Sequence, residues 1–227
     1  MRTVTAVAHR GDPYRHRENT LASLRSALRR GADAVEVDVR LTRDGVPVLL
    51  HDGTLKRLWE QDRPLASLSS DEVQGLTAGG VPTLADALRA SDGGRVMIDL
   101  PGEPSVRAVR RVVDVVRQCG ASERVYYCAG AQAMLAVRAA DPSAEIALTW
   151  TSLAPPRPAL LDAVRPRWLN YRFSLVDRAL AARVRRGGHL LSVWTPDTRR
   201  SMRRLLDLGV DSITTNRLDA LHALRGR

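Results

Sequence analysis

The chain has few lysines and few aromatic residues. Lys56 is the only lysine among 227 residues, so arginine supplies almost all of the positive charge, and the formal net charge is +10 at pH 7. Phe, Trp and Tyr together make up 4% of the chain, which leaves Ala, Val and Leu to fill the core. The net charge favours anionic partners such as phosphates, a membrane surface or nucleic acid. Basic and aromatic residues are not interleaved, however, and no nucleic-acid-binding motif is present, so we expect no nucleic acid partner.

Cysteines and long apolar runs are also scarce. Cys119 and Cys128 are the only cysteines, and their spacing fits neither a metal-binding motif nor a disulfide framework. No apolar run reaches the roughly 18 residues of a membrane span. Residues 1–8 lack the long apolar stretch and the cleavage site of a signal peptide. We therefore expect a cytoplasmic protein without a membrane span, whose contact with a membrane surface is at most weak; the oligomeric state is left open.

An alternation of strand-like and helix-like segments runs along the chain. The length, and an apolar fraction of 44%, suit one domain over residues 1–227 with a sizeable core. Runs that read as strands occur at 4–9, 34–39, 95–100, 124–128, 145–150, 167–171, 190–195 and 211–215. A helical pattern follows each run. Eight such units in one short domain favour a (β/α)8 barrel, or TIM barrel, over an open sheet, and place the chemistry at the carboxyl ends of the strands.

Two acidic residues interrupt the Val-rich segment that forms the second strand. Glu36 and Asp38 are two positions apart, so the period-2 geometry of a strand places both carboxylates on one face. Buried carboxylates are costly without a partner. The segment therefore favours a metal site or a general acid–base site over a surface hairpin with solvated charges.

The same segment predicts a hairpin inserted between the second strand and its helix. The triplet Arg-Asp-Gly at 43–45 indicates a turn, and residues 46–50 read as a short returning strand. If the two arms pair symmetrically about the midpoint between residues 44 and 45, position 38 faces position 51. We therefore expect His51 to lie beside the two carboxylates.

Two other strand ends carry candidate functional residues. His9-Arg10-Gly11 ends the first strand, where a guanidinium that binds phosphate oxygens would face the barrel mouth; the alternative is a turn with an exposed basic pair. Asp99 ends the third strand of the barrel, next to the strand of Glu36 and Asp38; the alternative is a cap for the following helix. Three converging carboxylates without a cysteine favour a hard cation, Mg²⁺ or Ca²⁺, over Zn²⁺.

These motifs together resemble a known family. The pattern His9-Arg10-Gly11, then Glu18-Asn19-Thr20, then GADAVEVDVRLTRDGVPVLLHD is similar to the glycerophosphodiester phosphodiesterase family. The late segment LLSVWTPDT…LLDLGVDSITTN resembles that family's closing strands, so the resemblance covers essentially the whole chain. It implies a (β/α)8 barrel that hydrolyses glycerophosphodiesters, which are small anionic phosphodiesters, to an alcohol and glycerol phosphate.

The resemblance also implies roles for individual residues. The implied ligands of one divalent cation, Mg²⁺ or Ca²⁺, are Glu36, Asp38 and Asp99. His9 and His51 would form the acid–base pair, with His9 as the base and His51 as the acid. Arg10 would contact phosphate, and Glu18 would support the loop after the first strand. Trp194, at the end of a predicted strand, is expected either to line the substrate pocket or to pack in the core.

Three positions depart from the family pattern and keep alternatives open. Asp99 stands where the bacterial family usually has Glu, Pro101 where it usually has Lys, and Asn216 where it usually has Asp. The missing lysine favours a non-catalytic phosphate-binding barrel, whereas the presence of both His9 and His51 favours an enzyme. A lysophospholipase D-like activity is the other enzymatic alternative, although the sequence shows no obvious apolar lip.

Overall fold

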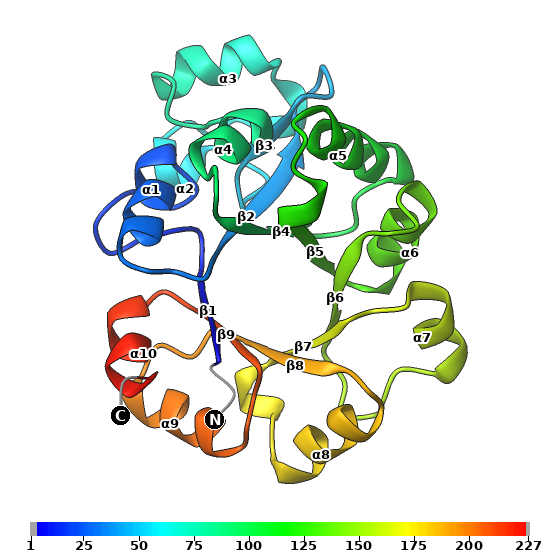
Figure 1. The fold of residues 1–227 in the computed structure, drawn as a ribbon. Helices are drawn as coiled ribbons and strands as arrows, with labels where there is room; N and C mark the ends of the chain where they lie inside the picture. The colour runs from blue at the N-terminus through cyan, green and yellow to red at the C-terminus, as the bar shows by residue number, and fades with distance from the viewer. Residues whose placement is uncertain (1–3, 226–227) are drawn as a thin grey trace.

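The computed structural model describes residues 4–225, which form a closed barrel of parallel strands surrounded by helices (Figure 1). The strands follow one another in the order β1-β9-β8-β7-β6-β5-β4-β2, and a further pairing of β1 with β2 closes the ring. They are β1 (Thr5–Ala8), β2 (Ala34–Leu41), β4 (Arg95–Asp99), β5 (Val125–Ala129), β6 (Glu145–Trp150), β7 (Trp168–Arg172), β8 (Leu190–Trp194) and β9 (Ser212–Thr215). The predicted (β/α)8 barrel is therefore confirmed.

Helices form the outer layer of the barrel and connect its strands (Figure 1). They are α1 (Leu21–Arg29), α4 (Leu84–Ala90), α5 (Val106–Gln118), α6 (Ala131–Ala140), α7 (Pro158–Val164), α8 (Arg178–Arg186), α9 (Arg199–Asp207) and α10 (Leu218–Arg225). Several begin at a side-chain cap: the hydroxyl of Thr20 accepts the N–H of Ser23 at α1, and that of Ser105 accepts the N–H of Ala108 at α5.

Two apolar layers stabilise the barrel. The larger layer lies between the strands and the helices and includes a row of α5 valines, Val109, Val112, Val113 and Val116, while the arginines of this helix lie largely at the surface. The smaller layer fills the barrel interior with Val7, Ala34, Met97, Tyr126, Cys128, Ala147 and Trp168. These interior residues alternate with the outward-facing core residues along each strand, as the period of two requires. Their packing fills the barrel interior below the carboxyl ends of the strands, where the polar side chains lie.

The hairpin after β2 is present, but its register differs from the prediction by one residue. β3 (Pro47–Leu49) pairs antiparallel with the end of β2, with Val39 opposite Leu49, and the Leu50 N–H donates to the Asp38 carbonyl at 3.0 Å. Position 38 therefore faces position 50, not position 51. The turn is a three-residue loop that ends on Gly45 at φ +78°, and an odd loop length moves the pairing by one position.

A small separate core holds the insertion against the barrel. Between β3 and α4 the chain forms α2 (Lys56–Trp59), a 3₁₀ turn at Leu65–Ser67 and α3 (Ser70–Thr77). Their buried apolar residues are Val48, Leu50, Leu55, Leu65, Leu68, Val73 and Val81. This core fixes the position of the loop that carries His51, because Leu50 and Leu55 flank that loop on either side.

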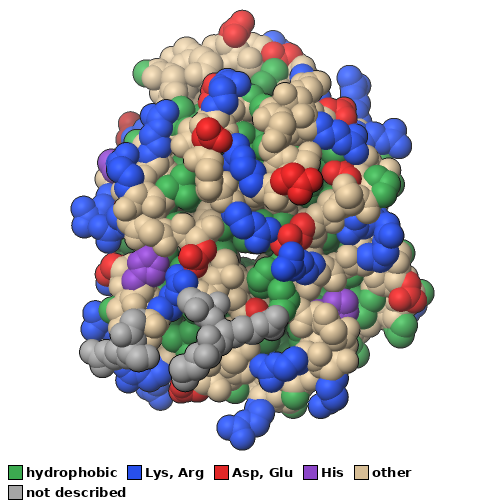
Figure 2. Space-filling view, viewed as in Figure 1, with side chains coloured by type: hydrophobic (Ala, Val, Ile, Leu, Met, Phe, Trp, Pro, Cys, Tyr) green, Lys and Arg blue, Asp and Glu red, His purple; other side chains and the backbone are tan. Residues whose placement is uncertain are grey.

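Basic side chains are distributed over the surface. On the face drawn in Figure 2, Lys and Arg side chains lie around the whole rim with Asp and Glu side chains among them, so the positive charge is not gathered in one patch there. Within residues 4–225, no helix has both the length and the apolar character that a membrane crossing demands.

Gly11 is the glycine whose replacement should disturb the fold most directly. It has φ +88°, and a Cβ there would lie 2.4 Å from the Ser23 hydroxyl and 2.6 Å from the Ser23 backbone carbon. Gly11→Ala should lower the free energy of unfolding by about 1–3 kcal/mol or more, because a positive φ is strained for alanine and the backbone of α1 must move. Gly53→Ala, which meets no atom within 4 Å, is the control. Equal urea midpoints for the two variants would contradict this account.

Candidate active site

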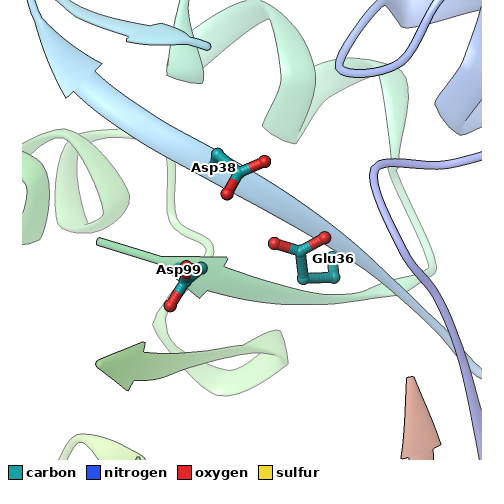
Figure 3. A group of neighbouring side chains, drawn as sticks. All are labelled: Glu36, Asp38 and Asp99. Carbon is teal, nitrogen blue, oxygen red and sulfur yellow. The ribbon is translucent and has the colours of Figure 1, made fainter. Parts of the chain in front are cut away.

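Three carboxylates converge at the carboxyl ends of β2 and β4. Asp38 pairs in register with Asp99 on the neighbouring strand, and Glu36 lies two positions earlier on the same face of β2. Figure 3 shows the three side chains pointing toward a common space. Each offers an oxygen that lies within 4.8 Å of the others. The structure therefore brings together the three residues that the sequence proposed as metal ligands.

Burial makes this cluster electrostatically costly. Glu36 and Asp38 are 3% and 1% exposed. Burial, and then repulsion from Asp38 and Asp99, raise the pKa of Glu36 well above its usual range. Burial and the charge of Asp38 raise the pKa of Asp99 to about 7. A divalent cation fits this donor set, because oxygens at roughly 2.0–2.6 Å from one ion lie within about 5 Å of each other and its charge offsets their repulsion.

Arg10 and Asn19 supply donors to the acidic cluster. The Arg10 backbone N–H donates to Glu36 Oε2 at 2.8 Å, and its Nε forms an ion pair with Asp38 Oδ2 at 3.0 Å. That buried Nε–H lacks a hydrogen-bond acceptor of good geometry among the described residues, so it remains available to a ligand oxygen. Asn19 Nδ2 donates to Asp38 Oδ2 at 2.8 Å, and its Oδ1 accepts the Asp38 N–H at 3.2 Å.

The role of Asn19 in holding Asp38 was missed by sequence reasoning. Asn19 is 2% exposed and adopts φ +56°. Its N–H donates to the Arg10 carbonyl at 3.0 Å, so the loop after β1 folds back over the end of β2. Asn tolerates the left-handed region better than most residues, but nothing local in the sequence identifies Asp38 as its partner.

His9 is held by a neutral amide. Its Nδ1 lies 2.8 Å from Asn216 Oδ1, while Asn216 Nδ2 and N–H donate to the two carboxylate oxygens of Asp197 at 2.7 and 2.9 Å. Because Asp197 orients the amide in this way, Nδ1 of His9 is the donor and Nε2 faces Glu36 Oε2 at 4.0 Å. Burial and the neighbouring Arg10 lower the pKa of His9, which favours the neutral imidazole.

His51 is held by a carboxylate and lies in a more open position, with 41% of its side chain exposed. Its Nδ1 lies 2.7 Å from Asp52 Oδ1. Arg57 Nε donates to the other oxygen of Asp52 at 2.6 Å, and this contact lowers the pKa of Asp52 to about 2. Among the described residues no hydrogen bond or ion pair joins His51 to Glu36 or Asp38. The predicted pairing of position 38 with position 51 is wrong, because the register differs by one residue.

Glu18 connects the two loops that carry these histidines. Its Oε1 accepts from Arg10 Nη1 at 2.9 Å and from Arg57 Nη2 at 2.7 Å. The two guanidinium groups lower the pKa of Glu18 despite its partial burial, so it stays ionised at neutral pH. Its predicted supporting position in the loop after the first strand agrees with these contacts. Sequence reasoning did not identify Arg57.

The structure also places Pro101, a departure from the family pattern, and Trp194, the candidate pocket residue. Pro101 follows β4 and lies near Arg40 of β2. The Arg40 Nη1 is 4.0 Å from the position that a Cβ on Gly102 would occupy. The Arg40 Nε donates to the His51 carbonyl at 2.7 Å. Arg40 also lowers the pKa of Asp99, although burial outweighs it. Trp194 ends β8, is half-buried, and its Nε1–H has no acceptor among the described residues.

A (β/α)8 barrel with ionisable groups converging at the carboxyl ends of its strands is the architecture of a TIM-barrel enzyme. A sequence model of the glycerophosphoryl diester phosphodiesterase family matches residues 9–220. The Mycobacterium tuberculosis protein named "Probable glycerophosphodiester phosphodiesterase 2" is 31% identical over 251 aligned positions, covering 95% of this chain and 88% of that protein. The chain thus belongs to the glycerophosphoryl diester phosphodiesterase family, whose members are phosphoric diester hydrolases.

Solved structures share this fold. An Oleispira antarctica phosphodiesterase in complex with the product sn-glycerol-3-phosphate superposes with a TM-score of 0.89 and 21% identity, covering 98% of this chain and 97% of that one. A glycerophosphodiester phosphodiesterase from Parabacteroides distasonis superposes with a TM-score of 0.84 and 24% identity, covering 99% and 97%. The barrel and the arrangement of its helices are therefore those of other members of this fold.

The raised pKa values predict a proton-linked metal site. The pKa of Asp99 is raised to about 7 and that of Glu36 well above its usual range, so protons on these carboxyl groups compete with the cation more strongly as the pH falls. Mg²⁺ or Ca²⁺ should bind more weakly at pH 6 than at pH 8, by up to about tenfold per pH unit for each proton displaced. Calorimetric titration in buffers of different ionisation enthalpy measures both Kd and proton release. Asp62→Asn, which removes an exposed carboxylate, is the control, and a pH-independent Kd would contradict the prediction.

A second prediction concerns Asn216. Asn216→Asp places a carboxylate 2.8 Å from His9 Nδ1, where it stabilises the imidazolium and should raise the pKa of His9 by about one unit or more. If His9 must be neutral to work, the acidic limb of kcat/KM then moves to higher pH. Titration of the imidazole ring by NMR measures the shift directly, with His189 as the internal control. An unchanged or lowered pKa of His9 would count against the assigned hydrogen bond.

Proposed function

We propose that this chain hydrolyses glycerophosphodiesters to an alcohol and glycerol phosphate, with one divalent cation, Mg²⁺ or Ca²⁺, and two histidines acting as base and acid. The observation that carries the proposal is the convergence of the buried Glu36 and Asp38 with the half-buried Asp99 at the barrel mouth, together with two histidines in different surroundings. Family membership supports phosphodiester hydrolysis, and the raised pKa values of the cluster support a bound cation.

Glu36, Asp38 and Asp99 would hold the cation, which supplies charge to non-bridging phosphate oxygens when bound. Arg10 presents its buried Nε–H next to Asp38 and would contact the same phosphate. A phosphate oxygen bound there would accept a hydrogen bond from the Arg10 Nε–H, which otherwise lacks an acceptor of good geometry.

The two histidines suit opposite proton transfers. His9 has a lowered pKa and an Nδ1 already engaged with Asn216, so its Nε2 carries the lone pair that accepts a proton from the nucleophile. His51 has its Nδ1 engaged with the Asp52 carboxylate, so its Nε2 is the nitrogen left to deliver a proton to the leaving alkoxide. The nucleophile is water, or a substrate hydroxyl that first forms a cyclic phosphate.

The setting of this activity is also part of the proposal. We expect residues 1–227 to act as a single catalytic domain on a small anionic substrate, and a cytoplasmic location remains a prediction. Trp194, half-buried with a free Nε1–H, would line the substrate pocket and contact an oxygen of the substrate's alcohol group.

Turnover of a substrate panel tests the reaction. Glycerophosphocholine, glycerophosphoethanolamine, glycerophosphoglycerol and a lysophospholipid should be compared with and without EDTA. We expect turnover of the glycerophosphodiesters, loss in EDTA and recovery with Mg²⁺ or Ca²⁺. Preference for the lysophospholipid would favour the lysophospholipase D-like alternative. Phosphate binding without turnover of any substrate would favour the non-catalytic barrel, and full activity in EDTA would remove the cation from the mechanism.

Substitution of the histidines tests their roles. His9→Ala and His51→Ala should each lower kcat by about 10²–10⁴-fold, the usual range for loss of general acid–base catalysis. Both proteins should fold, because these side chains lie at the barrel mouth outside the apolar core. His189→Ala is the control: its imidazole is hydrogen-bonded to the Pro166 carbonyl, near the start of β7. A normal kcat in either test variant would exclude that histidine.

A further inference from the structure

Arg57 joins the two loops that carry the catalytic histidines proposed above. From the short helix α2, its Nη1 and Nη2 donate to the two oxygens of Glu18 at 3.1 and 2.7 Å, in the loop after β1. Its Nε donates to Asp52 Oδ2 at 2.6 Å, in the loop after β3. All three nitrogens of one guanidinium are thus used, two on one loop and one on the other.

These contacts belong to a continuous chain of alternating charges. It runs from Asp38 through Arg10, Glu18, Arg57 and Asp52 to His51, and each successive pair is 2.6–3.0 Å apart at its closest atoms. One end of the chain is a proposed metal ligand and the other end is the proposed acid. Arg57 is the member that crosses from one loop to the other.

We infer that Arg57 is a positioning residue, which holds Asp52 so that His51 presents its Nε2 to the leaving group. This inference rests on the proposed function of His51 as the acid. Asp52 follows His51 directly and is otherwise free to rotate, since its described partners are His51 and Arg57. With Oδ2 held by Arg57, Oδ1 stays on the imidazole Nδ1. An ionised carboxylate only accepts hydrogen bonds, so Nδ1 must carry a proton and Nε2 is the nitrogen left for the substrate.

The fork of an arginine is required at this position. A guanidinium presents five N–H donors in a rigid plane and can serve two carboxylates at once, whereas a lysine ammonium acts as a point charge. The backbone that carries Arg57 is independently fixed. Arg17 stacks over the Trp59 ring at 4.1 Å, and a Cβ on Gly80 would lie 1.9 Å from that ring, so α2 is packed in place. Loss of the Arg57 side chain should therefore release Asp52 without unfolding the loop.

The choice of leaving group separates positioning of the acid from general damage. Arg57→Ala and Arg57→Lys should be assayed with glycerophosphocholine, whose alkoxide must be protonated, and with the glycerophosphoryl ester of p-nitrophenol, whose phenolate leaves without a proton. We expect Arg57→Ala to lower kcat on glycerophosphocholine by about 10- to 100-fold, less than removal of the acid itself, and on the nitrophenyl ester by no more than about threefold. Arg57→Lys should fall between Arg57→Ala and the unsubstituted protein on glycerophosphocholine.

Lys56→Ala is the matched control, because it removes a positive charge from the same helix and its partner is the exposed Asp62. It should leave both rates unchanged. Equal losses on the two substrates in Arg57→Ala, or no loss on glycerophosphocholine, would overturn the inference. If the unsubstituted protein turns over neither substrate, the proposed function has failed, and the state of His51 must be read directly.

A spectroscopic measurement provides that reading without turnover. The ¹⁵N shifts of the His51 ring, assigned with His51→Ala, report which nitrogen carries the proton. In the unsubstituted protein and in Lys56→Ala, neutral His51 should be protonated at Nδ1. In Arg57→Ala the two tautomers should both be populated. An identical His51 spectrum in Arg57→Ala would refute the positioning role whatever the enzymatic activity.

Discussion

The mutual repulsion of three carboxylates, two of them buried and one half-buried, is the constraint around which the barrel mouth is built. The register between β2 and β4 places Asp38 directly beside Asp99, and burial prevents water from screening the charges. Left alone, such a cluster holds protons, as the raised pKa values of Glu36 and Asp99 show. The surrounding donors only partly compensate: Arg10 and Asn19 each contact Asp38. A divalent cation would complete the compensation, which is why we propose that the site binds a metal ion.

The same constraint explains why the two histidines differ. His9 lies close to the cluster, where burial and Arg10 disfavour its charged form and its partner is a neutral amide. His51 lies farther out, more exposed, with an ionised aspartate as its partner. Environments of this kind separate a base from an acid in one site. The asymmetry comes from different loops, since the amide of Asn216 and the carboxylate of Asp197, which follow β9 and β8, hold His9, whereas Asp52 in the loop after β3 holds His51.

Loops rather than strands therefore decide how well the site is ordered. The loop after β1 is fixed by the close approach of Gly11 to Ser23 and by the left-handed conformation of Asn19. The loop after β3 is fixed by its own apolar core and by Arg57. Both loops meet at Glu18, so the arrangement of His9 and His51, the proposed base and acid, depends on contacts between segments about 40 residues apart along the chain.

The sequence by itself determined the fold and the acidic cluster, because both follow from local periodicity. Alternating strand and helix patterns predicted the barrel, and a spacing of two placed Glu36 and Asp38 on one face of a strand whose neighbour ends in Asp99. The sequence also predicted the Arg-Asp-Gly turn, but it did not determine whether the loop has an even or an odd number of residues. One residue more or less shifts the strand pairing by one position, so position 38 faces position 50 and not His51.

Only the tertiary structure decided which side chains hold the functional groups. Local periodicity does not predict the contacts of Asn216 with His9, Asn19 with Asp38 and Arg57 with Asp52. The first two of these contacts join residues that are 207 and 19 positions apart along the chain. Such partners are chosen by where closure of the barrel brings the loop ends together. Polar side chains at loop positions look alike in a sequence, and they acquire distinct roles once burial removes water as the competing partner.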